Sequence, residues 1–95
     1  MTRHRLPDRR GAEAFDFVHG ERRWTATVGR FPDGAVAEIF INAKPSPLAD
    51  MVQDAAILAS IALQHGASVE VVHHAIAGRG GPLAAALGLI NGGAK

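Results

Sequence analysis

The stretch from Ala35 to Gly66 constrains the fold of this chain of 95 residues more than any other. Its first part, 35–42, is rich in β-branched and aromatic residues that alternate in character, which is typical of a strand. Its second part, from Pro47 to His65, is rich in Ala, Leu and Ile, which favours a helix. A short turn segment, bracketed by Pro45 and Pro47, separates the two parts. The stretch therefore predicts a strand that leads directly into a long helix.

The predicted helix has clear start and stop signals. Ser46 is a good N-cap residue, Pro47 suits the first helical position, and His65-Gly66 is a typical end. Two shorter helices are expected after it, at about 68–77 and 82–90.

Two further strands precede this unit. Residues 14–19 and 22–31 both alternate in polarity, and Gly20-Glu21 between them suits a tight turn. The residues Phe31-Pro32-Asp33-Gly34 then predict a second turn, because Pro presets φ and Gly accepts a positive φ. We therefore expect an α+β fold, in which a three-stranded antiparallel meander packs against a long central helix and two short helices follow.

The central helix carries more apolar residues than one small sheet can cover. The residues expected to face the sheet form one broad stripe: Leu48, Met51, Val52, Ala55, Leu58, Ala59 and Ala62. Ile57, Ile61 and Leu63 fall outside this stripe or at its border. A helix that is apolar on two sides is either central or in contact with another chain, so we expect a homo-oligomer, with a dimer favoured, that uses these three residues.

Composition places the chain among single-domain globular proteins. Apolar residues make up 47% and charged residues 20%, which is incompatible with wholesale disorder. There is no cysteine, so thiolate catalysis, disulfides and cysteine-ligated zinc are excluded. Residues 1–13 are basic and are predicted to be a flexible arm, and 14–92 one domain. No signal peptide or membrane span is expected, so a cytoplasmic location is the default.

Several basic residues are candidate contacts for anions or for a protein partner. Those in the arm and at the start of the second strand are Arg9, Arg10, Arg22 and Arg23, and Lys44 and Arg79 lie in later loops. Phosphate contacts from arginine and stacking on Trp24 would suit a nucleic acid, but a net charge of only +1 implies no strong general affinity for nucleic acid. Nucleic-acid binding is therefore not favoured, and a protein partner is expected.

Glu38 invites two readings. It lies in the middle of a predicted strand beside Phe40, and the neighbouring strand contains arginines. It forms either a cross-strand ion pair or, with Trp24 or Phe40, a recognition site on an exposed sheet face.

The five histidines do not predict a metal site, because the adjacent His73 and His74 project about 100° apart on a helix. No catalytic group, cofactor site or metal site is predicted.

The order of these segments resembles the TSCPD domain. The residues that carry the resemblance are Thr25-Ala26-Thr27-Val28, Asp33-Gly34, Ala37-Glu38-Ile39-Phe40-Ile41-Asn42, Lys44, Ile61-Ala62-Leu63-Gln64-His65-Gly66 and Ala67-Ser68-Val69-Glu70. The resemblance covers about residues 5–90. It implies a domain found at the C-terminus of adenosylcobalamin-dependent ribonucleotide reductases and as small free-standing proteins of bacteria and their prophages.

The chain departs from that family at its most characteristic element. The cysteine motif that names the family is absent, and Gly81-Pro82-Leu83 stands at the corresponding end. A metal or thiol role implied by the reductase version cannot carry over, and the radical chemistry belongs to a large barrel domain that does not fit in this chain.

We therefore expect a non-catalytic binding or oligomerisation module. Two alternatives stay open. One is an inhibitor from a phage or mobile element that binds a host nucleoprotein complex, such as an anti-CRISPR protein. The other is a regulator that binds a nucleotide or nucleic acid, with Arg79 and Lys44 as phosphate contacts.

Overall fold

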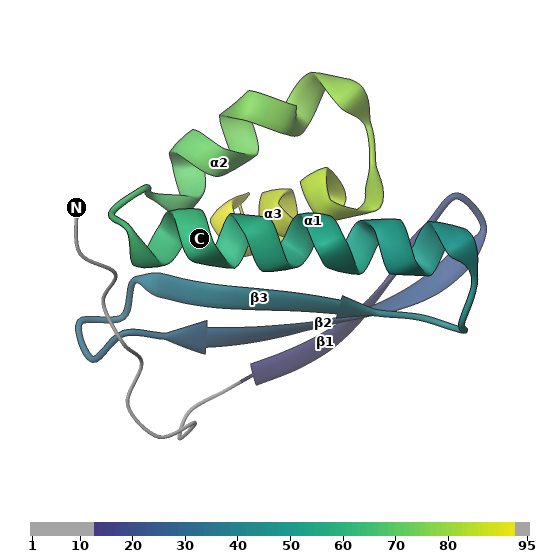
Figure 1. The fold of residues 1–95 in the computed structure, drawn as a ribbon, viewed down its shortest axis with the longest axis horizontal. Coiled ribbons are helices and arrows are strands. Elements are labelled where there is room, and N and C mark those ends of the chain that lie inside the picture. The colour runs from purple at the N-terminus through teal and green to yellow at the C-terminus, as the bar shows by residue number, and fades with distance from the viewer. Residues whose placement is uncertain (1–12, 93–95) are drawn as a thin grey trace.

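The computed structural model describes residues 13–92 and contains three strands followed by three α-helices (Figure 1). In chain order the elements are β1 (Glu13–His19), β2 (Arg22–Arg30), β3 (Val36–Asn42), α1 (Pro47–Gln64), α2 (Val69–Ile76), the short 3₁₀-helix η1 (Ala77–Arg79) and α3 (Pro82–Gly92). The predicted α+β architecture is confirmed, with element ends within two residues of those expected. The basic arm predicted for 1–13 lies outside the described residues, except that Glu13 begins β1.

The sheet is an antiparallel meander in the order β1-β2-β3. His19 pairs with Arg22 across a two-residue turn in which Gly20 and Glu21 both have positive φ, 62° and 63°. Such a turn matches the twist of the flanking strands, although a left-handed conformation is unfavourable for glutamate. The register between β2 and β3 shifts at Gly29/Arg30, which marks a bulge.

The second turn forms as predicted from its residues. The N–H of Gly34 donates to the carbonyl of Phe31 at 2.8 Å, and the N–H of Phe31 donates to the carbonyl of Ala35 at 2.8 Å. Asp33 accepts a hydrogen bond from the N–H of Ala35 at 2.9 Å, and Gly34 has φ 92°. This turn holds the end of β2 against the start of β3.

All three α-helices lie on the same face of the sheet, and α1 runs along β3 (Figure 1). Ser46 caps α1 by accepting the N–H of Ala49 at 3.0 Å, as its position predicted. Ser68 caps α2 in the same way through the N–H of Val71 at 3.1 Å.

The side of α1 that faces the sheet differs from the one that its apolar residues predicted. The buried residues of α1 are Ala49, Val52, Ala56, Ala59, Ser60, Leu63 and Gln64. Leu48, Met51 and Leu58 are instead exposed, at 47%, 68% and 67%. Small side chains let the helix approach β3 closely, so the larger leucines and the methionine point outward. The predicted stripe was therefore wrong for these three positions.

Polar side chains on the inner side of α1 bond the outer edge of β3. The Ser60 hydroxyl accepts from the N–H of Ile39 at 2.8 Å, and Gln53 accepts from the N–H of Ile41 at 2.9 Å. Gln64 donates to the carbonyl of Ala37 at 3.1 Å. These backbone groups alternate along the strand and point away from β2. The helix thus satisfies an edge that would otherwise be open.

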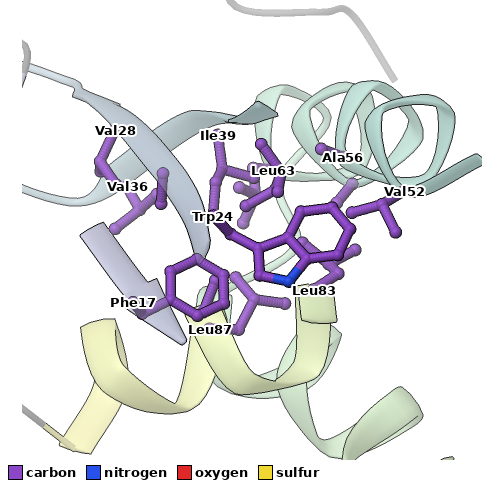
Figure 2. Close-up of a cluster of buried hydrophobic side chains, with 14 of the residues drawn as sticks. Phe17, Trp24, Val28, Val36, Ile39, Val52, Ala56, Leu63, Leu83 and Leu87 are labelled. Atoms are coloured by element: carbon purple, nitrogen blue, oxygen red, sulfur yellow. The ribbon is translucent and has the colours of Figure 1, made fainter. Parts of the chain in front are cut away.

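The core lies between the sheet and the helices, with Trp24 at its centre (Figure 2). Trp24 is 1% exposed, and its indole N–H donates to the carbonyl of His19 at 3.2 Å. Phe17 beside it comes from β1, Val52 and Leu63 from α1, and Leu87 from α3 (Figure 2). The core around this one aromatic ring therefore joins the sheet to α1 and α3.

Candidate functional site

The outer side of α1 is the most apolar exposed surface of a single element in the described residues. Met51 and Leu58 are about two-thirds exposed, and Ile57 and Ile61 are 42% and 37% exposed. We call this surface the outer face of α1, made up of Leu48, Met51, Ile57, Leu58 and Ile61. Exposed Asp50 and Asp54 lie on the same helix.

The sequence predicted only part of this surface. Ile57 and Ile61 are exposed, whereas Leu63, predicted beside them, is 2% exposed and belongs to the core. The prediction for Leu63 was wrong because this residue lies on the same side of the helix as Ala56 and Ala59. Spacing alone could have found Met51 and Leu58, which are separated by seven residues, or two helical turns.

Three predicted basic residues meet at one end of the sheet. Arg22, Arg23 and Lys44 line a hollow of about 650 Å³, together with Glu21, Thr25, Asn42 and Ala43. We call this the basic hollow. The guanidinium of Arg22 is already engaged, because it donates to the Ser46 hydroxyl at 2.9 Å and lies 5.7 Å from the centre of the Trp24 ring. Arg23 and Lys44 are exposed and available to a ligand.

The predicted recognition site of Glu38 with Trp24 or Phe40 is only partly assembled. Trp24 faces the core and is buried, so the expectation that it offers a surface for stacking was wrong. Glu38 and Phe40 pair with Gly29 and Thr27, on the opposite face of the sheet from Trp24. Glu38 is 8% exposed, and a Cβ atom at Gly29 would lie only 2.8 Å from its Oε2. Its carboxylate therefore packs over a glycine.

The remaining predicted contacts are dispersed. Arg79 is exposed in η1, away from the residues that line the basic hollow. Arg9 and Arg10 lie outside the described residues. Among residues 13–92, no three histidine or carboxylate side chains converge in a way that could hold a metal ion. Nor is any helix in that range both long and apolar enough to cross a membrane.

A larger groove was not predicted from the sequence. It has a volume of about 1120 Å³ and lies between the β2–β3 turn, the turn from α1 to α2, and the last turn of α3. Apolar side chains of Phe15, Val36, Leu63, Val69 and Ile90 line it. Its charged residues are Glu13, Arg30, Asp33 and Glu70, so we call it the acidic groove. No local motif marks it, because its walls come from six helices and strands and from two turns.

The sequence matches the model of one protein family. The model of the TSCPD domain matches residues 2–90 of the 95 in the chain, which includes all three strands, α1 and α2. Comparison with curated proteins and with solved structures gave no match. The absence of cysteine means that this chain lacks the cysteine motif of the family. By the extent of the family match, the chain belongs to the TSCPD domain family.

Proposed function

We propose that this chain is a non-catalytic binding module that self-associates through the outer face of α1. The observation that supports the proposal is the exposure of Met51 and Leu58, at 68% and 67%, next to Ile57 and Ile61. Large apolar side chains that are grouped on one exposed surface mark interaction sites more often than scattered ones do. A second copy is the simplest partner, because a twofold axis brings the same apolar surface against itself.

The expected association is weak. The 18 residues of α1 make a helix only about 27 Å long, and a stable interface usually needs roughly 800 Å² from each partner. A face of this size lies at the small end of specific interfaces, so dimers should form only at high protein concentration.

Sedimentation velocity over a wide concentration range tests the proposal. We expect a reversible monomer–dimer equilibrium in the unmodified chain, and at least about tenfold weaker association in Leu58→Glu, because a charge would be buried in the interface. Val71→Glu is the matched control, because Val71 is 63% exposed in a different helix, α2.

A strictly monomeric chain at millimolar concentration would overturn the proposal. So would equal effects of Leu58→Glu and Val71→Glu on the dissociation constant. Circular dichroism of both variants separates lost association from lost folding.

A second candidate function is the binding of an anion, such as a nucleotide or nucleic acid, in the basic hollow. It is favoured by one observation, that Arg22, Arg23 and Lys44 line the same hollow. Binding of a labelled oligonucleotide should weaken with salt, and the slope of log K against log salt should fall by about one when Arg23→Ala removes a phosphate contact. A salt slope unchanged by Arg23→Ala and Lys44→Ala would remove this candidate.

The remaining alternative, an inhibitor from a phage or mobile element, differs from the first proposal in the partner that the chain binds. A phage or mobile-element protein that blocks a host nucleoprotein complex would inhibit that complex in a purified assay. Absence of inhibition with an anti-CRISPR assay would count against it, and the sedimentation result would be unaffected.

A further inference from the structure

The acidic groove has the chemical character of a site for a basic, partly apolar peptide segment. Three carboxylates, from Glu13, Asp33 and Glu70, lie around it with one guanidinium, from Arg30. Arg30 is already engaged, because it lies 3.3 Å from Glu13 Oε1 and donates to the carbonyl of Gly34 at 2.9 Å. Within residues 13–92, no cation pairs with the Glu70 carboxylate.

Two helix ends add to this negative character. The last residues of α1 and of α3, including Leu63, Ile90 and Asn91, line the groove. The C-terminal end of a helix carries about half a negative elementary charge, which favours cations. Neither α1 nor α3 has a basic residue in its last turn. The N-terminal end of α2 acts in the opposite sense, but Glu70 in its first turn offsets it.

The groove is also lined by apolar side chains, several of which are more buried than its charged residues. Phe15, Val69 and Ile90 are half-buried and Val36 and Leu63 are buried, all from different elements. An apolar floor with charged groups around it suits an amphipathic ligand better than a bare cation. A ligand segment with arginines and one apolar side chain would satisfy both parts.

The chain carries such a segment next to the groove. Residues 1–12, MTRHRLPDRRGA, contain four arginines, one aspartate and Leu6, and they are joined directly to Glu13, which lines the groove. Twelve extended residues span up to about 40 Å, so the segment can reach any part of the groove. Covalent attachment gives it a local concentration on the order of millimolar, so even weak ion pairs suffice.

We propose that residues 1–12 bind in the acidic groove of the same chain, with their arginines against Glu70 and Asp33 and with Leu6 on the apolar floor. The inference goes beyond the self-association of α1 and does not depend on it, because the groove and the outer face of α1 share no residue. A segment bound there would hold its arginines away from other partners until a stronger acidic partner competes for them.

Paramagnetic relaxation enhancement in the full chain tests this proposal directly. The chain has no cysteine, so Thr2→Cys gives a single site for a nitroxide label. We expect selective broadening of the amide signals of Gly34, Ser68 and Glu70, and little broadening at Arg23 and Lys44 in the basic hollow. Equal broadening at the groove and at the basic hollow would overturn the proposal.

A charge variant separates specific binding from random proximity. Glu70→Lys should reduce the enhancement at Gly34 and Ser68 by about two- to fivefold, since surface ion pairs are individually weak. Asp54→Lys is the matched control, because Asp54 is an exposed carboxylate outside the groove. Equal effects of the two variants would contradict the proposal. Leu6→Ser should also reduce the enhancement, through loss of an apolar contact that salt does not screen.

A mixed sample decides which chain the segment binds. Chains that carry the nitroxide but no ¹⁵N are mixed with ¹⁵N-enriched chains that carry no nitroxide. Any broadening of the ¹⁵N-detected signals then reports contact between copies. The proposal expects none at dilute concentration. Broadening of groove signals in the mixture would overturn binding within the chain.

Discussion

The Ser60 hydroxyl in α1 accepts a hydrogen bond from the N–H of Ile39 at 2.8 Å and lies 3.0 Å from the carbonyl oxygen of the same residue. One side chain thus reaches both outward-facing backbone groups of one strand residue. Gln53 and Gln64 reach the neighbouring alternate residues of β3, Ile41 and Ala37. The outer edge of the sheet is therefore bonded by side chains of a helix instead of by another strand.

Ser60→Ala should destabilise the domain by about 1–3 kcal/mol, because it leaves the N–H and carbonyl of Ile39 buried without this partner. The substitution changes almost no volume, so no cavity contributes. Chemical denaturation gives the free energy of unfolding, and Asp54→Ala on the exposed side of α1 should change it by less than about 0.5 kcal/mol. Equal losses in the two variants would show that the edge contact contributes nothing.

Gly29→Ala should destabilise the domain by about 1–3 kcal/mol through overpacking. A Cβ atom there would lie 2.8 Å from Oε2 and 2.9 Å from Cγ of Glu38, which is nearly buried. In a double-mutant cycle, Gly29→Ala should cost less when Glu38 is already alanine. An additive cycle would mean that the two residues do not crowd each other.

Glu21→Asn should stabilise the domain by about 0.5–1 kcal/mol, because asparagine tolerates the left-handed conformation better than glutamate. Glu21 has φ 63° in the two-residue turn between β1 and β2. Thermal unfolding should show a higher midpoint. The control Glu21→Val, with a β-branched side chain at the same position, should lower it.

Leu63→Ala should mainly lower the stability of the fold, whereas Ile61→Ala should mainly weaken self-association. Leu63 is 2% exposed, so its truncation should cost about 2–5 kcal/mol of stability through a cavity. Ile61 is 37% exposed, so its truncation should cost far less stability but should weaken self-association. Unfolding and sedimentation of both variants measure the two effects. Loss of association in Leu63→Ala without loss of stability would place the interface elsewhere.

Local patterns predicted the elements and turns of this chain well. The alternation of 14–19, 22–31 and 35–42, the caps Ser46 and Ser68, and the turn residues Asp33 and Gly34 all act through groups close in sequence. Such signals predict structure correctly because their physical causes, local backbone conformations and capping hydrogen bonds, involve only a few neighbouring residues. The TSCPD resemblance was visible at the same level.

The faces of α1 were predicted less well. Apolar spacing favoured Leu48, Met51 and Leu58 as the inner side, yet the helix buries Ser60 and Gln64 instead. The signal was present in the sequence, since Gln53, Ser60 and Gln64 recur at spacings of seven and four on one side of a helix. Its meaning depends on a strand edge that must be satisfied, which no helical periodicity describes.

The sequence by itself determined the order of three strands and three helices, the turns between them, and membership of the TSCPD domain family. Only the tertiary structure decided which side of α1 meets β3, that Trp24 is buried, and that Glu13, Asp33 and Glu70 surround one groove. The reason is that turns and caps depend on neighbours in the chain. Burial, edge satisfaction and grooves depend on groups that are distant in sequence and meet only when the elements pack.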